Sequence, residues 1–596
     1  MKTTAHAMGF PTLDPERTVT RLPDQPALRP RLWPALALLL IFWTAHFVVG
    51  AIDKPYFVGF IYGMAAPALL LLLFSVWWWT NRRIAFSDRI YGCLAVVIMG
   101  IAAAPLCHRS VWFGLATEGL PRALTVLTLW TLIVSWTGLA WYRLGLLAVL
   151  ALSWGWFALI RIDGLNSDLK ATTSWRWVAT EEEEFLASHA GTTQTSDDDL
   201  DLPPLQLSAG DWPGFRGADR DGVIRGVTLS ADWESAPPRP LWRKRLGPAW
   251  SSMIVIGDRL YTQEQRGKEE TVVCYEASTG QQLWAHGDVS RFEETVSRAG
   301  PRATPTFADG RIYTLGANGI LNCLGPRGGK CYWSHDITVD APAKVPQWGF
   351  SGSPLVVDGK VIVFAGGNTE RNLLAYDART GELAWTAPAG AGSYASPQLI
   401  TIAGQRHCLF LSENGLTAVD PASGHPLWQF GAAMPGAPRT HQVHRVGESH
   451  LFVPTLSGVG ASRINVQRQG DQWQVSEVWA SSKVKPEFPD FVVHDGYAYG
   501  FDGPVFCCVD LAKGSRRWKD GRYGRGQALL LADASQLLVT SEDGELILLA
   551  ADPEKNRELG RLQALKGTTW NHPVIAHGRL YVRNAVEMAS YDISGR

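Results

Sequence analysis

The chain has 596 residues, of which 46% are hydrophobic and 19% charged, and its formal net charge is −1 at pH 7. No basic patch or stripe stands out, so the sequence excludes nucleic acid as a partner. The apolar residues are unevenly distributed, because the composition changes completely near residue 162.

Five apolar stretches precede that point, each 17–24 residues long. This length is close to the roughly 20 residues that a helix needs to cross a bilayer, so we expect a bundle of five transmembrane helices. The first stretch is not a cleavable signal, since a long basic segment precedes it and more spans follow. The stretches are Trp33–Gly50, Phe57–Thr80, Ile90–Cys107, Ala123–Trp141 and Leu144–Ile160.

Basic residues near the ends of these spans predict the orientation. The tail before the first span and the loops after the second and fourth are richer in Lys and Arg than the opposite loops, which contain only Lys54, Arg109 and Arg122. By the positive-inside rule, the N-terminus is cytoplasmic and the C-terminal part lies in the periplasm of a Gram-negative cell. The sequence thus divides into a cytoplasmic tail (1–31), a transmembrane domain in the inner membrane (32–161), a polar acidic linker (162–210) and a periplasmic domain (211–596).

The linker contains two acidic runs, EEEEF at 181–185 and SDDDLDL at 196–202. They predict a short amphipathic helix and a solvated acidic segment. A calcium loop is disfavoured, because the ligand-spaced glycine pattern of such loops is absent.

A ten-residue phrase recurs in the last domain. It reads YEASTGQQLW (275–284), YDARTGELAW (376–385), VDPASGHPLW (419–428) and VDLAKGSRRW (509–518), with a degenerate copy, LGPRGGKCYW, at 324–333. Repeats of about 40–50 residues bounded by short strands and glycine turns are typical of propellers and solenoids. The glycine suits the positive φ of a hairpin turn, and the final Trp is expected to pack between neighbouring sheets.

Each phrase follows another hairpin, so one repeat has four strands, as a propeller blade does. The first hairpins occur near Gly257, Gly310, Gly359, Gly404, Gly447, Gly496, Asp533 and Gly578, which predicts eight four-stranded antiparallel blades. The last repeat stops at Arg596 before its fourth strand. We expect the segment 241–247 (LWRKRLG) to supply that strand and close the ring, which leaves no open sheet edge.

The eight cysteines contain no haem-attachment motif and no zinc-spaced set. Cys274, Cys323 and Cys508 occupy the repeat position of Ala375 and are expected to be small core residues. The adjacent pair at 507 and 508 would have to break strand alternation to form a disulfide, which we therefore do not expect. Cys323 and Cys331 flank one turn and could cross-link it in an oxidising compartment, and the sequence leaves this open.

Residues just before the innermost strands are expected to line the mouth of the propeller axis. This set is aromatic and basic, which would suit a flat anionic ligand; the alternative is that these side chains only plug the channel. No carboxylate cluster accompanies it, so no metal site is predicted, and Glu413, Glu542 and Asp543 fall in turns where solvation explains them. The candidate ligand residues are Trp250, Arg302, Tyr394, His441, Arg525, Trp570, Asn571 and His572, with Phe350, Ser351, Thr440 and Phe488 beside them.

With its repeated phrase and the segment DWPGFRGADRDG (211–222), the region 211–596 resembles bacterial PQQ-like β-propeller repeat proteins. Two characterised groups of proteins with this fold represent the two possible functions. Membrane-bound quinoprotein glucose dehydrogenases place five spans before an eight-bladed periplasmic propeller, whereas the propeller lipoprotein of the outer-membrane protein assembly machinery is a scaffold that binds no quinone.

Two hypotheses follow from the resemblance. The first is a membrane-anchored module that binds an envelope protein or a small anionic or aromatic ligand. The second is a dehydrogenase that uses pyrroloquinoline quinone (PQQ) and calcium to oxidise an alcohol or sugar and passes electrons to membrane ubiquinone. Because fold does not determine function, the residues at the axis must discriminate between them.

Overall fold

The computed structural model describes residues 30–52, 56–137, 141–188, 205–233, 235–294, 296–367, 370–436, 439–456 and 459–594. These residues form two compact units. The first comprises the described part of the chain up to Val48 together with Gly63–Leu159, and the second comprises the remainder, including everything from Ile160 onward.

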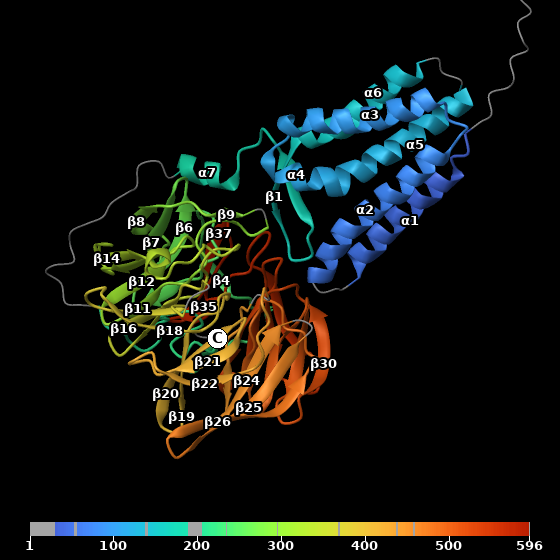
Figure 1. Cartoon of the computed structure of the whole chain (residues 1–596). Helices are drawn as coiled ribbons and strands as arrows, with labels where there is room; N and C mark the ends of the chain where they lie inside the picture. The colour runs from blue at the N-terminus through green and yellow to red at the C-terminus, as the bar shows by residue number, and fades with distance from the viewer. Residues whose placement is uncertain are drawn as a thin grey trace, which may run out of the picture. The chain divides into compact units, whose positions relative to one another are not determined.

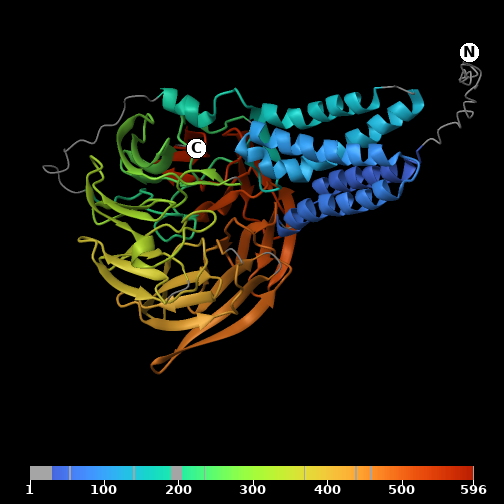
Figure 2. The ribbon, with the colours of Figure 1, turned by 45° about the horizontal axis from the view of Figure 1, so that its top comes forward.

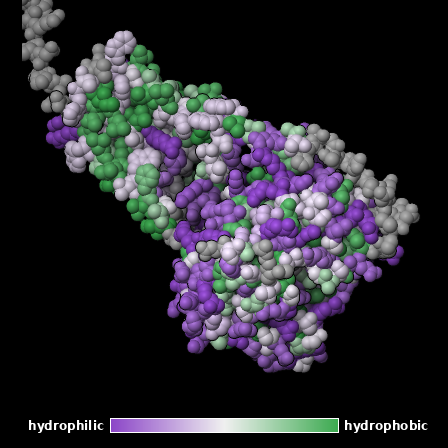
Figure 3. Space-filling model, turned by 180° about the vertical axis from the view of Figure 1, so that it is seen from behind, coloured by the Kyte–Doolittle hydropathy of each residue, from purple (hydrophilic) through white to green (hydrophobic). Residues whose placement is uncertain are grey.

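The first unit is helical. Five of its described helical segments are long and apolar enough to cross a membrane, which confirms the predicted number of long apolar helices. Large hydrophobic side chains such as Leu72, Ile101 and Leu152 are exposed on these helices. Figure 3 shows many hydrophobic residues, in green, on the surface of this unit. The helices are α1 (Trp33–Ala51), α2 (Tyr56–Thr80), α3 (Phe86–Ala103), α5 (Leu120–Thr137) and α6 (Tyr142–Leu159), with η1 (Ala104–Leu106), η2 (Arg109–Val111), α4 (Trp112–Gly114) and the π-helical turn η3 (Leu115–Gly119) between α3 and α5.

The second unit contains an eight-bladed β-propeller of four-stranded antiparallel blades, as predicted (Figures 1 and 2). The strands of the first four blades are β5 (Ile254–Ile256), β6 (Arg259–Arg266), β7 (Glu269–Glu276) and β8 (Gln282–Val289); β11 (Thr306–Ala308), β12 (Arg311–Leu315), β13 (Ile320–Leu324) and β14 (Cys331–Asp336); β15 (Leu355–Val357), β16 (Lys360–Phe364), β17 (Leu373–Asp377) and β18 (Leu383–Ala387); and β19 (Gln398–Ile402), β20 (Gln405–Ser412), β21 (Gly415–Val419) and β22 (Pro426–Phe430).

Blades 5 to 8 repeat this pattern, and the short β3 (Val223–Ile224) adds a parallel fifth strand to blade 7. Their strands are β23 (His444–Val446), β24 (His450–Leu456), β25 (Gly460–Gln469) and β26 (Gln472–Ser481); β27 (Val492–His494), β28 (Tyr497–Asp502), β29 (Val505–Asp510) and β30 (Ser515–Arg522); β31 (Gln527–Leu531), β32 (Gln536–Thr540), β33 (Glu545–Ala550) and β34 (Glu558–Gln563); and β35 (Val574–Ala576), β36 (Arg579–Arg583), β37 (Glu587–Asp592) and β4 (Arg239–Arg245).

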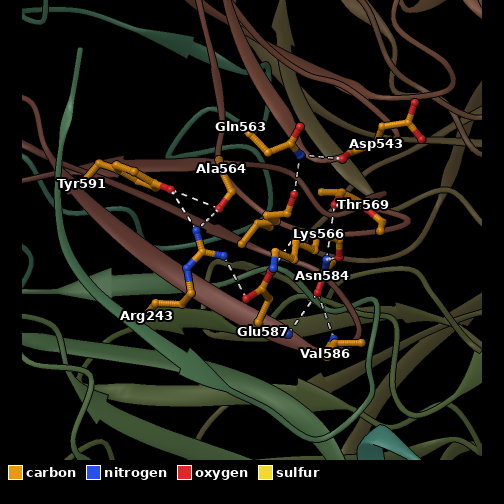
Figure 4. A network of polar contacts seen from close by, with 12 residues as sticks. Arg243, Asp543, Gln563, Ala564, Lys566, Thr569, Asn584, Val586, Glu587 and Tyr591 are labelled. Carbon is orange, nitrogen blue, oxygen red and sulfur yellow. Dashed lines mark hydrogen bonds and ion pairs between the residues drawn. The ribbon is translucent and has the colours of Figure 1, made fainter. Parts of the chain in front are cut away.

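The ring closes as predicted, because β4 pairs antiparallel with β37 and completes blade 8. The strand begins two residues earlier than expected. Arg243 of β4 reinforces the closure, since its guanidinium pairs with Glu587 on β37 at 2.9 Å and donates to the carbonyl of Ala564, which follows blade 7 (Figure 4). The borrowed strand is thus bonded to both of the last two blades.

The Trp of the repeated phrase joins neighbouring blades. Trp385 of blade 3 donates its indole N–H to the carbonyl of Pro421 in blade 4 at 3.2 Å. Gly424 in the same turn has a φ of +73°, and a Cβ on it would lie 2.5 Å from the Trp385 ring. The glycine is therefore required for contact as well as for backbone conformation. Equivalent indole bonds link Trp242 to Ala277, Trp284 to Pro326, Trp333 to Ala378, Trp479 to Leu511 and Trp518 to Asp552.

The described part of the linker is more structured than the sequence predicts. It contains a hairpin of β1 (Ile160–Leu165) and β2 (Ala171–Trp175), followed by α7 (Glu181–Ser188). A capping box between Thr180 and Glu183 starts this helix. Phe185 of α7 is fully buried beneath the guanidinium of Arg266 in blade 1. The acidic run at 196–202 lies outside the described residues.

All eight cysteines are free thiols, including Cys323 and Cys331. In the ladder, Cys323 lies opposite Trp333 and Cys331 lies opposite Leu324, so the two thiols are not paired across the strands. Cys274, Cys323 and Cys508 are fully buried in the propeller core, as expected. Burial also raises the pKa of the Cys274 thiol to about 12, which makes it unreactive.

Candidate functional site

The predicted mouth residues lie where each blade enters its innermost strand. The strands β5, β11, β19, β23, β31 and β35 begin two to four residues after Trp250, Arg302, Tyr394, His441, Arg525 and Trp570, respectively. Neighbouring first strands, such as β23, β27 and β31, contact one another, so they form the inner ring of the propeller. The structure therefore brings the candidates to one ring, and their contacts show what each can do.

On one side of the mouth, two indoles face each other. The rings of Trp250 and Trp570 are 4.6 Å apart and inclined at 38°. The indole N–H of Trp250 donates to the carbonyl of Ser297, and that of Trp570 donates to the carboxylate of Glu542 at 3.0 Å. Each indole therefore already has a protein partner.

The tip of the β1–β2 hairpin binds beside this pair. Glu542 of blade 7 accepts the backbone N–H of Ser167 at 2.8 Å as well as the Ser167 hydroxyl. The next residue, Asp168, pairs with the guanidinium of Arg525 at 3.1 Å. Asn166 holds the tip in shape, because its side-chain oxygen accepts the N–H groups of Asp168 and Lys170. A segment from the linker thus occupies this part of the mouth.

Both candidate arginines of the mouth are engaged by protein groups. Arg525 is 2% exposed and also donates to the carboxylate of Glu487. Arg302 donates to the hydroxyl of Ser297 at 2.8 Å and to the carbonyls of Arg298 and Gly300. Burial lowers the pKa of the Arg302 guanidinium to about 10, so it stays charged near neutral pH. Neither cation is held ready for an anionic ligand.

A second segment lies on the inner side of the ring. Arg216, which is 1% exposed, pairs with Asp490 of blade 6 at 3.2 Å, whereas Arg220 donates to the carbonyls of Ser353 and Pro354 in blade 3. Phe215 of the same segment packs edge-on against His572 of blade 8. The segment 211–222 therefore connects blades 3, 6 and 8 on the inner side of the ring, a role that its sequence did not reveal.

The candidate His and Asn residues are buried near this segment. Desolvation lowers the pKa of His441 to about 3 and that of His572 well below its usual value, and the charge of Arg216 adds to both effects. Asn571 donates to the carbonyl of Ser251. His441 and His572 belong to the interior of the propeller, because their imidazoles are neutral and buried near Arg216.

The opposite side of the mouth is aromatic and hollow. Trp348 lies 5.2 Å from Tyr394, and its ring also meets the edge of Phe488 at 6.2 Å. A cavity of about 260 Å³ opens beside Trp348 and Tyr394 and is lined further by glycine backbone and by Glu413. Of the predicted candidates, Tyr394 is the one that lines this cavity.

The expectation that Glu413 and Glu542 are solvated turn residues is wrong. Glu542 is 6% exposed and accepts hydrogen bonds from Ser167, Trp570 and Arg525, and Glu413 is half-buried at the cavity. A signal was present, because SENG (412–415) and SEDG (541–544) occur in only two of the eight blades. Within the described residues, no group of three or more His, Cys, Asp or Glu side chains could hold a metal ion.

The fold and these positions define a propeller of the PQQ-like repeat class. The predicted resemblance is confirmed by a family model, described as outer membrane protein assembly factor BamB, that matches residues 268–519. The quinohemoprotein alcohol dehydrogenase ADH IIB of Pseudomonas putida is 34% identical over 120 residues, which cover 19% of this chain and 17% of that protein. ADH-IIG of the same organism is 28% identical over 158 residues, 24% of this chain and 21% of that protein.

This chain therefore matches only about a fifth of the length of these curated relatives. Among solved structures, that of BamB from Moraxella catarrhalis covers 60% of this chain and 98% of its own, at 17% identity and a TM-score of 0.41. The family model and the sequence matches relate the propeller both to an assembly factor and to quinohemoprotein alcohol dehydrogenases.

The residues at the mouth do not fit the flat anionic quinone that the dehydrogenases use. Such a group needs an aromatic face and unpaired cations. Here, the two indoles face each other, and Arg302 and Arg525 are bonded to protein acceptors. In addition, Ser167 and Asp168 occupy the mouth next to the indole pair.

Proposed function

We propose that this chain is a membrane-anchored periplasmic propeller that binds a protein or small ligand rather than an alcohol or sugar dehydrogenase. The proposal is based on two contacts, the ion pair of Asp168 with Arg525 and the hydrogen bond of Ser167 to Glu542. Through them, the charged side of the mouth already binds a segment of the same chain. The aromatic side, with Trp348 and Tyr394 at a cavity, is left for a ligand.

The helical unit supports the anchoring part of this proposal. Its five apolar helices suit insertion into the bacterial inner membrane. The sequence similarity to quinohemoprotein alcohol dehydrogenases favours a second candidate, a PQQ dehydrogenase that delivers electrons to ubiquinone. The two functions make opposite predictions for cofactor binding.

The test uses the full-length chain purified in detergent, with PQQ and calcium added at micromolar concentration. We expect no bound-cofactor absorbance after gel filtration and no dye reduction with a panel of sugars and alcohols. The same measurements on Asp168→Ala show whether the hairpin tip alone excludes the cofactor. Stoichiometric PQQ in the unaltered protein, with substrate-dependent dye reduction, would establish the dehydrogenase instead.

A further inference from the structure

Glu413 in blade 4 and Glu542 in blade 7 lie in equivalent turns, which make the same pattern of backbone hydrogen bonds. The N–H of Glu542 donates to the carbonyl of Tyr523 at 2.9 Å, and that of Glu413 donates to Gly392 at 3.0 Å. The carbonyl of Glu542 accepts the N–H of Thr569 at 2.8 Å, and that of Glu413 accepts Met434 at 2.6 Å. The acceptor residues Tyr523 and Gly392 are therefore equivalent in the two blades. Arg525 and Tyr394, which follow them by two residues, are equivalent as well.

The contacts of Glu542 show what a carboxylate at this turn position can bind. It accepts a backbone N–H and a hydroxyl from one residue, Ser167, at the tip of a hairpin. Bonds from neutral donors to a carboxylate are strong, and two from one serine fix the orientation of the turn. The residue after that serine then meets the side chain at the position of Arg525.

Glu413 has the same backbone hydrogen bonds, but only one of its two carboxylate oxygens accepts a hydrogen bond from a described residue. Its Oε2 accepts the N–H of Gly436 at 2.9 Å, and among the described residues Oε1 has no hydrogen-bond donor. The cavity of about 260 Å³ begins at this carboxylate, and a second cavity of about 520 Å³ meets it at Gly367 and Ala391. Glycines line the first cavity, so backbone can approach closely.

We propose that the Glu413 cavity binds a turn of a second polypeptide, in the way that Glu542 binds the hairpin tip of its own chain. The turn would present a Ser or Thr whose N–H and hydroxyl donate to Glu413. Because Tyr394 stands where Arg525 stands in blade 7, and Trp348 packs against it, the next residue of the turn is apolar rather than acidic. This inference rests on the proposed binding function and names its site and partner class.

The test uses a fluorescent, disulfide-cyclised peptide that copies residues 163–172 of the hairpin and carries Asp168→Leu. Binding to the full-length protein in detergent is measured by fluorescence anisotropy. We expect saturable binding, and a loss of about tenfold or more in affinity with Glu413→Gln, because the carboxylate becomes a neutral amide. Replacing the exposed Glu448 by Gln is the matched control and leaves the affinity unchanged. The unmodified peptide, with Asp168, binds more weakly than the leucine peptide.

Three results would overturn the inference. The first is that no peptide binds up to millimolar concentration although the melting temperature shows a folded protein. The second is that Ser167→Ala in the peptide has no effect. The third is that Glu542→Gln weakens binding and Glu413→Gln does not, since the peptide would then compete with the internal hairpin. None of these results depends on PQQ, whose binding tests the proposed function separately.

Discussion

The carboxylate of Glu542 accepts four hydrogen bonds from three residues at the propeller mouth. It accepts hydrogen bonds from the Ser167 N–H and hydroxyl, the Trp570 indole and the Arg525 backbone, while it is 6% exposed. A buried carboxylate is stable only when its acceptor sites are used, so its partners are ordered together with it.

Replacement of Glu542 by Ala should therefore release the hairpin. We expect faster amide exchange in the peptide that covers residues 164–172, and a loss of about 2–3 kcal/mol in the free energy of unfolding, because charged hydrogen bonds are lost and buried donors are left unpaired. Hydrogen exchange with mass spectrometry measures the first effect. Glu558→Ala, which removes an exposed ion pair with Arg561, is the control. Unchanged exchange at the tip would show that other contacts hold the hairpin.

The buried histidines predict a pH dependence of stability. His441, with a pKa of about 3, and His572 remain neutral in the folded protein, whereas their unfolded forms take up a proton near pH 6.5. The unfolded state thus binds more protons as the pH falls, so stability is complete above about pH 6.5 and decreases below it, by up to about 1.4 kcal/mol per pH unit for each histidine.

Melting temperatures measured from pH 8 to pH 4.5 test this dependence. We expect them to fall steadily below about pH 6.5, and His441→Gln to reduce the slope. Replacement of His425, which lies exposed in a turn, should leave the slope unchanged. A flat profile across this range would show that the imidazoles can be protonated in the folded state.

At the scale of elements, the repeated phrase is a connector between blades. Most outer-strand Trp residues donate to a carbonyl in the turn of the next blade and cover a glycine there, as Trp385 does with Pro421 and Gly424. The contact therefore sets the angle between neighbouring blades as well as filling space. Trp428 is an exception, because its indole donates to His407 of its own blade.

Replacement of Trp385 by Ala should cost about 3–5 kcal/mol, because the change removes a large aromatic group and the hydrogen bond to Pro421. The free energy of unfolding, from denaturant titration followed by circular dichroism, measures this loss. Leu383→Ala on the same strand is the control, since that side chain is 38% exposed and its loss should cost less than about 1 kcal/mol. An unchanged stability for Trp385→Ala would remove this Trp from the core.

Periodic features could be predicted from the sequence, and contacts between distant segments could not. The strands, blades and closing strand follow from local alternation, turn residues and the recurring Trp, each of which leaves a pattern in the chain. The contact of Ser167 with Glu542 joins residues 375 positions apart. The pairing of Arg216 with Asp490 likewise depends on the closed ring, so neither the hairpin tip nor the segment 211–222 has a local signature.

The same limit applies to the candidate site. The positions of Trp250, Tyr394 and Arg525 at the mouth follow from the repeat alignment, but their availability depends on partners outside the repeat. Arg525 lies where expected, yet Asp168 and Glu487 neutralise it. The cavity in the aromatic half of the mouth is lined in part by Glu413, which turn chemistry alone predicts to be solvated.

The orientation of the whole chain in the membrane determines the compartment in which the propeller lies, and therefore which partners it can bind. Basic residues gather at one end of the helical unit: exposed Arg82 and Arg83 lie between α2 and α3, and Arg143 at the start of α6 pairs with Asp88 of α3 at 2.9 Å. The positive-inside rule assigns this end to the cytoplasm. With an odd number of spans, we therefore expect the chain after α6 to lie in the periplasm.

Reporter fusions test this orientation. Alkaline phosphatase fused near residue 200 should be active and green fluorescent protein at the same point dark, because the first reporter folds in the periplasm and the second in the cytoplasm. Fusions between Arg82 and Arg83 should give the opposite pattern and serve as the internal control. If the fusion near residue 200 were fluorescent and lacked phosphatase activity, the propeller would be cytoplasmic, and its partner would have to be sought there.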